Sequence, residues 1–207
     1  MSEIRLREAE IGDAGRLLEI YSYYVKNTAV TYEWEVPSLQ EFEKRIATVK
    51  EKFPYLVALQ EDKIVGYAYA APFRTRAAYA WNVETSIYVD KDCRGSGVGT
   101  MLLNELERQL KAQNILNIYA VISYKEEEDE YLTHGSVLFH DKMGYKKVSE
   151  WHQCGYKFKR WYNIVIMEKM LGEHTEEPRD VVYKLVLKNK NLKPHSYIDS
   201  KNTTDIT

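Results

Sequence analysis

The most constraining feature of the sequence is a glycine-rich segment between a predicted strand and a predicted helix. Residues 83–89 (VETSIYV) are rich in β-branched side chains and lead into residues 94–99 (RGSGVG), while residues 101–110 (MLLNELERQL) have helical spacing. The first N–H groups of a helix have no partner within it and carry the positive end of its dipole. Glycines at such a junction indicate an anion site, because a phosphate can approach the backbone without a Cβ in its way.

Two well-known phosphate-binding patterns do not fit this segment. A P-loop ends in Gly-Lys-Ser/Thr, whereas this chain has Gly99-Thr100-Met101 and no lysine for the phosphates. A dinucleotide fingerprint needs G-x-G-x-x-G, whereas Gly95, Gly97 and Gly99 alternate and position 100 is a threonine. A plain β-to-α turn without a ligand is the alternative, so the rest of the sequence has to decide.

Composition limits the class of protein. The 207 residues suffice for one domain with a real core and a tail. A formal net charge of −2 argues against nucleic-acid binding by phosphate neutralisation. No apolar run approaches the ~20 residues of a membrane helix, so we expect no membrane partner. With two cysteines and no apolar leader at its start, the protein is expected to be cytoplasmic and reduced.

The hydrophobic pattern predicts an α/β (α+β) fold around one sheet. The expected order is β-α-α-β-β-β-α-β-α-β-β, which is not a strict βαβ repeat. Asp13 can cap the first helix, and Ser38 with Glu41 forms a capping box for the second. Strands are expected over residues 4–7, 55–59, 64–70, 83–89, 117–123, 145–158 and 162–170, and helices over about 13–25, 38–52, 101–113 and 135–143.

Two segments are expected to lie outside this core. The charge run at residues 125–130 (KEEEDE) predicts a solvated loop. Residues 172–207 are polar, and only residues 181–187 (VVYKLVL) have the pattern of a strand. We therefore expect one domain over residues 1–171 and a partly mobile C-terminal extension over residues 172–207.

Several stretches resemble the GNAT superfamily of N-acetyltransferases, and within it the phosphinothricin and methionine sulfoximine acetyltransferase branch. The family's pyrophosphate loop, Arg/Gln-x-x-Gly-x-Gly/Ala after a strand, matches in register at Arg94, Gly97 and Gly99. The branch is further indicated by residues 71–79 (APFRTRAAY), 83–89, 139–145 (FHDKMGY) and 161–164 (WYNI). The resemblance covers about residues 3–170. It implies a mixed, mostly antiparallel sheet flanked by helices, with the CoA pyrophosphate loop at a β-to-α junction.

The resemblance implies that acetyl-CoA is the acyl donor. Backbone amides of the glycine segment would hold its pyrophosphate, Arg94 would add positive charge, and the end of the preceding strand would bond the pantetheine arm. The implied cofactor residues are Ile87, Tyr88, Val89, Arg94, Gly95, Ser96, Gly97, Val98, Gly99, Thr100 and Ser136. The branch usually has an asparagine where this chain has Thr133, which puts one pantetheine hydrogen bond in doubt. The histidines show no ligand spacing, so no metal is expected.

Amine acetylation needs a base for the amine and a proton for the leaving thiolate. Glu84 is the candidate base, because it lies on the strand face opposite to Val83 and Thr85 and the branch has a glutamate there. The alternative is an exposed or ion-paired strand glutamate. His140 lies five residues before Tyr145, where many acetyltransferases have a tyrosine acid and the branch has histidine. It is either an acid toward the CoA sulfur or a packed, hydrogen-bonded residue.

The acceptor is expected to be a small-molecule amine, an α-amino acid or analogue resembling phosphinothricin or methionine sulfoximine. Arg74 and Arg76 beside Tyr79 suit a carboxylate or a tetrahedral anion through bidentate bonds. Tyr32 and Trp34 are candidates for the pocket wall. The plain alternative for the arginines is an exposed loop without a ligand.

Two other functions stay open at this point. The same fold can acetylate a polyamine, an antibiotic or a peptide amine, for which Glu33, Glu35 and residues 126–130 would line a cationic cleft. A CoA-binding module without catalysis is the second alternative, although Glu84 and His140 are both present. A homodimer is expected from the branch alone.

Overall fold

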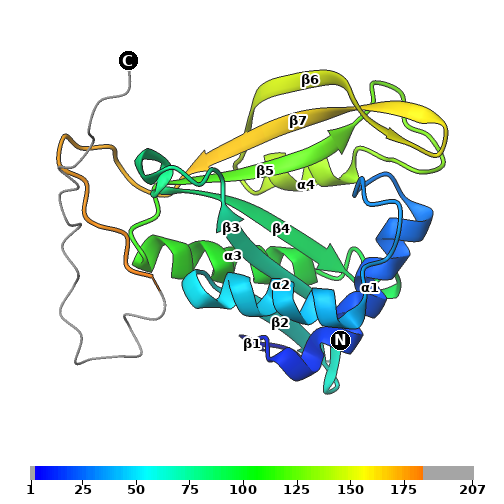
Figure 1. The fold of residues 1–207 in the computed structure, drawn as a ribbon, viewed down its shortest axis with the longest axis horizontal. Coiled ribbons are helices and arrows are strands. Elements are labelled where there is room, and N and C mark those ends of the chain that lie inside the picture. The colour runs from blue at the N-terminus through cyan, green and yellow to red at the C-terminus, as the bar shows by residue number, and fades with distance from the viewer. Residues whose placement is uncertain (1–2, 184–207) are drawn as a thin grey trace, which may run out of the picture.

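The computed structural model describes residues 3–183 of the chain and confirms the predicted order of strands and helices. Its helices and strands are β1 (Ile4–Glu8), α1 (Ala14–Asn27), α2 (Leu39–Lys52), β2 (Tyr55–Gln60), β3 (Lys63–Pro72), β4 (Asn82–Val89), α3 (Val98–Ala112), β5 (Asn117–Tyr124), α4 (Gly135–Lys142), β6 (Lys146–Lys157) and β7 (Arg160–Met170) (Figure 1). Short 3-10 turns η1 (Ile11–Asp13), η2 (Ala77–Tyr79) and η3 (Lys91–Cys93) join some of them.

One seven-stranded sheet in the order β1-β2-β3-β4-β5-β7-β6 forms the centre of the fold. Every neighbouring pair is antiparallel except β4 and β5, which run parallel. The predicted hairpin between β2 and β3 turns at Glu61 and Asp62, whose φ angles of 49° and 62° are typical of a tight two-residue turn. The expected mixed, mostly antiparallel sheet is therefore confirmed.

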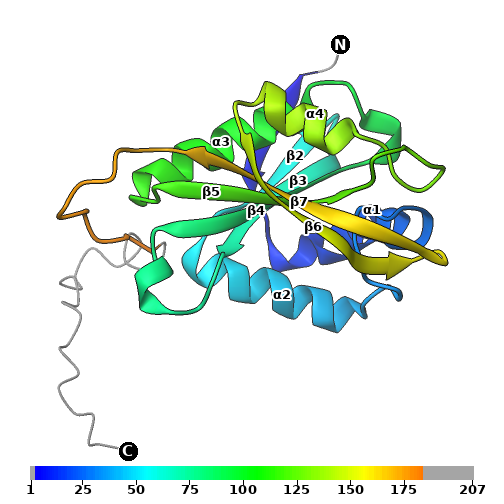
Figure 2. The same ribbon diagram turned by 90° about the horizontal axis from the view of Figure 1, so that it is seen from above.

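The helices cover both faces of this sheet. Figure 2 shows α3 and α4 on one face and α1 and α2 on the other. Leu102, Leu103 and Leu106 of α3 are fully buried against the first face. The second face carries a cluster of stacked tyrosines that includes Tyr67 and Tyr88, whose ring centroids lie 5.3 Å apart. Side chains alternate between the two faces along each strand, which decides what each residue of β4 can reach.

The helix starts match the sequence in one case and differ in another. Ser38 caps α2 as predicted, since its hydroxyl accepts a hydrogen bond of 3.1 Å from the backbone N–H of Glu41. Asp13 precedes α1, but its carboxylate makes no cap bond; it accepts two hydrogen bonds from Arg7, at 2.7 and 2.8 Å, and one from the backbone of Glu10. The charge-assisted hydrogen bonds from Arg7 are stronger than a cap bond to a neutral backbone N–H, so the Asp13 carboxylate bonds to Arg7 and does not cap the helix.

The one parallel pair among the described strands separates after three residues. The pairing of β4 with β5 covers Asn82 to Glu84 against Asn117 to Tyr119 and then ends. From that point the two strands diverge toward their C-terminal ends, as Figure 1 shows. Glu84 and its partner Tyr119 therefore occupy the vertex of an opening in the middle of the sheet.

The acidic loop at residues 125–130, which was expected to be a solvated loop, is exposed only in part. In the acidic loop residues 126–128 are exposed, but Asp129 accepts hydrogen bonds from Lys125 and two backbone N–H groups and pairs with Arg160 at 3.1 Å. Asp129 thus fixes this loop, which charge pattern alone did not predict.

The described part of the extension, residues 172–183, packs on the domain. Trp81 donates a hydrogen bond of 2.8 Å to the carbonyl of Arg179, and the Tyr183 ring lies edge-on to Phe53. Residues 181–183 do not form a strand, and the rest of the strand predicted over residues 181–187 lies outside the described residues. Among residues 3–183, no helix is long and apolar enough to cross a membrane.

Candidate active site

The opening between β4 and β5 forms a small cavity of about 70 Å³. Its walls come from both diverging strands and from α4, which contributes Ser136 and His140. Beyond Glu84, the edge of β4 that faces β5 has no strand partner within the described structure. A strand edge without a partner presents N–H and C=O groups that an extended ligand can bond.

The glycine segment lies at the C-terminal end of this opening. Gly95 and Gly97 have φ angles of 73° and 87°, in the left-handed region where side chains with a Cβ are strained. Gly97 is also the residue before α3, and no side chain caps that helix. The hydroxyl of Ser96 donates to the carbonyl of Cys93 at 2.6 Å. The first N–H groups of α3 therefore meet no side chain of the loop.

A phosphate has room to reach those N–H groups. A Cβ built on Gly95 or Gly97 would meet no atom within 4 Å, so these glycines are set by their backbone angles and face open space. Gly99, the second residue of α3, differs. A Cβ built on it would come to 3.5 Å from the Phe139 ring. The loop thus combines a fixed left-handed backbone with an open approach to a helix N-terminus, which suits a pyrophosphate.

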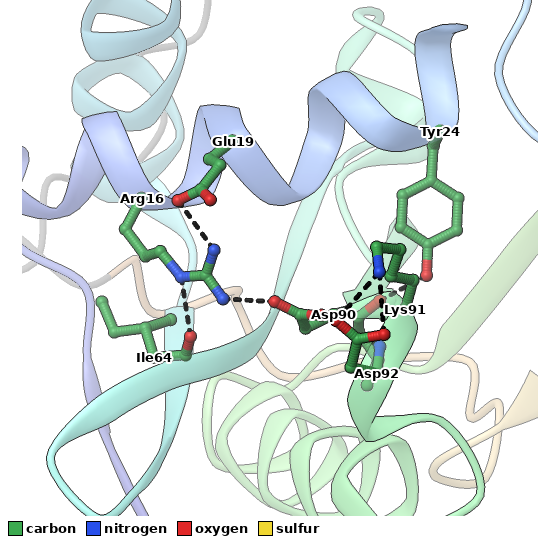
Figure 3. A network of polar contacts seen from close by, with 8 residues as sticks. Arg16, Glu19, Tyr24, Ile64, Asp90, Lys91 and Asp92 are labelled. Carbon is green, nitrogen blue, oxygen red and sulfur yellow. Dashed lines mark hydrogen bonds and ion pairs between the residues drawn. The ribbon is translucent and has the colours of Figure 1, made fainter. Parts of the chain in front are cut away.

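Contacts with α1 hold the end of β4 and the start of this loop in place (Figure 3). Arg16 donates to the carbonyl of Ile64 at 3.0 Å and pairs with both Glu19 and Asp90. Asp90 in turn accepts a hydrogen bond of 3.0 Å from the backbone of Asp92. The Tyr24 hydroxyl donates to the carbonyl of Val89.

Arg94 is exposed and lies over two tyrosines of α1. Its guanidinium carbon is 5.2 Å from the ring centroid of Tyr23 and 5.1 Å from that of Tyr24. A guanidinium over aromatic faces keeps its N–H groups free in its own plane. Arg94, the arginine predicted to contact the phosphates, therefore lies directly before the glycine loop and packs on the rings of Tyr23 and Tyr24.

Glu84 lies on the α1 and α2 face of the sheet, opposite to Val83 and Thr85, as the alternation of the strand predicts. Burial raises the pKa of its carboxyl group, and the nearby charge of Arg74 partly opposes that rise. On the same face, Tyr69 hydrogen-bonds to Ser86 and interacts electrostatically with Glu84. A half-buried carboxylate with a raised pKa in a cleft is suited to act as a general base.

His140 is buried in the wall of the sheet opening. Its Nδ1 donates a hydrogen bond of 2.8 Å to the carbonyl of Ser136, because a carbonyl can only accept. The rings of Phe139 and Tyr145 pack edge-on against it at 5.1 and 5.0 Å. Burial lowers its pKa, more than the Ser136 carbonyl raises it. The neutral ring therefore has a lone pair, and no proton, on Nε2.

The predicted acceptor residues Arg74, Arg76 and Tyr79 lie between β3 and β4. Arg74 donates to the carbonyl of Phe73 at 2.9 Å, and its guanidinium lies 4.3 Å above the Phe73 ring. Arg76 is exposed directly before η2. Tyr79 lines a second, larger cavity of about 380 Å³ near the start of β4. The structure thus brings Arg74 into electrostatic contact with Glu84.

Tyr32 and Trp34 contact a different wall, the β6–β7 hairpin. The Tyr32 hydroxyl donates to the carbonyl of Asn163 at 2.9 Å, and the Trp34 indole donates to the carbonyl of Tyr156 at 3.2 Å. The Tyr32 ring lies directly on Gly155, where a Cβ would come within 2.1 Å of it. The five predicted acceptor residues therefore form two groups: Arg74, Arg76 and Tyr79 between β3 and β4, of which Arg74 interacts with Glu84, and Tyr32 and Trp34 on this hairpin.

Three residues near the site were not found from the sequence. Tyr69 is a neighbour of Glu84, and strand alternation places it on that face. Tyr119 is at the vertex, but no local signal marks a residue that pairs across a parallel sheet. Lys157 is buried and donates to the carbonyls of Thr28 and Thr31 at 2.9 and 2.8 Å; burial lowers its pKa to about 8.

Within residues 3–183, no three His, Cys, Asp or Glu side chains are grouped to hold a metal.

Comparison with known proteins identifies the class. Residues 6–166 match the family described as an acetyltransferase (GNAT) domain, so the chain belongs to the GNAT acetyltransferase family. It is an N-acetyltransferase of a class that uses acetyl-CoA as its acyl donor.

Phosphinothricin and methionine sulfoximine acetyltransferases are among the relatives and solved structures that this chain resembles. A crystal structure of a GNAT superfamily phosphinothricin acetyltransferase from Sinorhizobium meliloti, in complex with acetyl-CoA, has a TM-score of 0.80 at 35% identity, covering 89% of this chain and 97% of that chain. The phosphinothricin N-acetyltransferase of Streptomyces coelicolor is 29% identical over 82% of this chain and 98% of its own length. The L-methionine sulfoximine/L-methionine sulfone acetyltransferase of Pseudomonas paraeruginosa is 29% identical over 84% and 98%.

Proposed function

We propose that the protein transfers the acetyl group of acetyl-CoA to the α-amine of a small amino acid or analogue by direct attack, with Glu84 as the general base. The observation that carries this proposal is the place of Glu84 at the vertex where β4 and β5 separate. The glycine loop opens at one end of that gap, and Arg74 lies beside the glutamate on the acceptor side. The relatives named above, which act on phosphinothricin or methionine sulfoximine, support an amino-acid acceptor.

The donor is held by the backbone rather than by side-chain chemistry. The N–H groups of residues 96–100 would bind the pyrophosphate, Arg94 would add charge, and residues 87–89 would bond the pantetheine arm along the unpaired edge of β4. Ser136 lies on the α4 side of the same opening. When bound, acetyl-CoA supplies an activated thioester carbonyl; these residues only orient it.

Glu84 makes the acceptor amine neutral. An ammonium has no lone pair, so its proton must be removed before attack, directly or through one ordered water. Burial raises the pKa of Glu84, which makes the carboxylate a stronger base than an exposed glutamate, and the charge of Arg74 partly opposes that rise. Arg74 also suits the carboxylate of an amino acid held next to that amine.

His140 is proposed to position the donor rather than to begin as the acid. Its Nδ1 proton is committed to the Ser136 carbonyl, so the neutral ring offers only the Nε2 lone pair to the opening. It can accept a hydrogen bond from a donor group in the opening, and it can pass a proton on only after taking one up.

The test is a panel of amines with acetyl-CoA, read by release of free thiol. The panel contains phosphinothricin, methionine sulfoximine, neutral L-amino acids and spermidine. Thiol release with amino acids and none with spermidine is the expected result. A preference for spermidine would move the acceptor to the polyamine class, and acetyl-CoA binding without release on any amine would indicate a non-catalytic module.

A further inference from the structure

The segment that follows the family's matched residues builds one wall of the cavity of about 380 Å³ beside the acceptor side of the site. His174, Thr175 and Pro178 face this cavity from residues 172–183, while Phe73, Tyr79 and Tyr119 face it from the domain. Figures 1 and 2 both show the segment after β7 turning back beside the loop between β3 and β4. We name residues 172–183 the strap.

The strap is fixed to the domain at several points. The carbonyl of Asp180 accepts a hydrogen bond of 2.7 Å from Asn114, and the N–H of Val182 donates to the carbonyl of Gln113 at 3.0 Å. His174 donates through Nε2 to the Asn117 side-chain oxygen at 2.7 Å. The ring contact of the partly buried Tyr183 with Phe53 completes this attachment. A wall fixed in this way can shape a pocket, since it does not have to be ordered by the ligand.

The chemistry of the lining excludes a charged ligand group. As formed by residues 3–183, the lining holds rings of Phe73, Tyr79 and Tyr119 and contains no Asp, Glu, Lys or Arg. Four of its polar side chains bond one another in pairs: His174 with Asn117, and the Tyr119 hydroxyl with the Asn82 side-chain oxygen at 3.4 Å. The surface offered to a ligand is therefore mainly aromatic, and a much smaller apolar cavity of about 150 Å³ is known to hold a benzene ring.

The position of this cavity relative to Glu84 defines a three-point site. Tyr119 pairs with Glu84 across the sheet, so both side chains lie on the same face. Phe73 stacks on Tyr119 with centroids 4.3 Å apart, and Arg74 covers the other face of Phe73. An amine at Glu84 and a carboxylate at Arg74 would leave the side chain of an L-amino acid pointing to the Phe73 and Tyr119 rings.

We propose that the strap completes a side-chain pocket for the acceptor and that this pocket selects L-amino acids with a flat, uncharged, aromatic side chain. The inference rests on the proposed acetylation of an amino acid and specifies which amino acids are preferred. A flat aromatic acceptor differs from phosphinothricin and methionine sulfoximine, the acceptors in the relatives' names.

The experiment compares kcat/KM for L-phenylalanine, L-alanine and methionine sulfoximine with the full chain, using acetyl-CoA and thiol release. L-phenylalanine is expected to exceed L-alanine by roughly tenfold or more, the difference that burying an aromatic side chain supports. Ala78→Phe, which fills the cavity from an exposed position, should lower the phenylalanine-to-alanine ratio at least tenfold. Ala77→Phe is the matched control, since the neighbouring exposed residue does not line the cavity, and it should keep the ratio.

A strap variant gives a second measurement. His174→Ala removes the hydrogen bond to Asn117 and enlarges the cavity. The preference should therefore move from phenylalanine toward the larger tryptophan. Thermal melting checks that the variant folds. Equal kcat/KM for all side chains, or equal ratios in Ala78→Phe and Ala77→Phe, would overturn the pocket while leaving the acetylation of amino acids intact. Absence of thiol release with every amino acid would instead count against the proposed function.

Discussion

The proposed donor and acceptor halves of the site are assembled in different ways. The donor half is one continuous stretch, from β4 through the glycine loop into α3, held against α1 by Arg16 and Tyr24. The acceptor half gathers Arg74 from the loop after β3, Tyr119 from β5 and His174 from the strap. A cofactor that stays the same can be served by a fixed local motif, whereas an acceptor that varies is served by segments that can change one at a time.

Glu84 stands where the two halves meet. If the division holds, variants of the donor half should change only the affinity for acetyl-CoA, and variants of the acceptor half should change only the acceptor parameters. A change at Glu84 should affect the reaction itself.

The largest effect is expected from Glu84→Gln. Without a carboxylate the amine keeps its proton, so kcat should fall ~10²-fold or more while the Kd of acetyl-CoA stays unchanged. The wild type should gain activity as pH rises through the raised pKa of Glu84, because the carboxylate form is the base. Glu127→Gln in the exposed acidic loop is the control for loss of a charge. A variant with normal turnover across pH would remove Glu84 from the mechanism.

Arg74→Ala tests the acceptor half. Loss of a charge-assisted hydrogen bond is worth about 1.5–3 kcal/mol, so the acceptor KM should rise roughly tenfold or more without a change in the Kd of acetyl-CoA. Because the charge of Arg74 lowers the pKa of Glu84, the acid limb of the pH profile should also move to higher pH. Arg108→Ala, on the exposed surface of α3, serves as the control. An unchanged acceptor KM would mean that the anion of the acceptor is held elsewhere.

The sequence predicts features of the proposed donor half better than contacts in the proposed acceptor half. The element order, the left-handed turns at Gly95 and Gly97 and the face of Glu84 depend on neighbours along the chain, so patterns of spacing and glycine placement predict them. The contact of Arg74 with Glu84 and the stacking of Phe73 on Tyr119 depend on which strands pair, and that is decided by the packing of the whole sheet.

The sequence did not predict the ion pairs of Asp13 and Asp129, and the reason is the same for both. Asp13 has the sequence position of a helix cap, and Asp129 lies in a run that reads as solvated, yet arginines from other elements pair with both carboxylates. An ion pair between distant segments leaves no trace in local spacing. The strap shows the limit most clearly, since its polar composition gave no sign that His174 and Pro178 line a cavity.

Gly97→Ala tests the donor half. A residue with a Cβ pays about 1–2 kcal/mol in the left-handed conformation that the loop adopts, so the Kd of acetyl-CoA should rise by at most roughly thirtyfold, with the acceptor KM unchanged. Gly15→Ala in α1 is the matched control, because its Cβ would meet nothing within 4 Å and its helical backbone accepts alanine. A folded Gly97→Ala variant that binds acetyl-CoA as tightly as the wild type would show that the φ angle of 87° is not needed for donor binding.

The smallest effect concerns the loop between α1 and α2, which Lys157 fixes through the carbonyls of Thr28 and Thr31. Its pKa is lowered from 10.5 to about 8 in the folded protein, so between these values the unfolded chain binds more protons than the folded one. The free energy of unfolding must then rise with pH in that window, by at most about 1.4 kcal/mol per pH unit from this group.

Lys157→Met removes the titrating group. Urea unfolding followed by tryptophan fluorescence, between about pH 8 and pH 9.5, should show a less positive slope of stability against pH in the variant than in the wild type. Lys157→Arg keeps a positive charge that does not titrate in this range, so it should also lose the extra slope while retaining a donor for the two carbonyls. Equal slopes in all three proteins would mean that Lys157 titrates alike in the folded and unfolded states, and a lysine that is not desolvated cannot be the buried anchor of the loop that carries Tyr32 and Trp34.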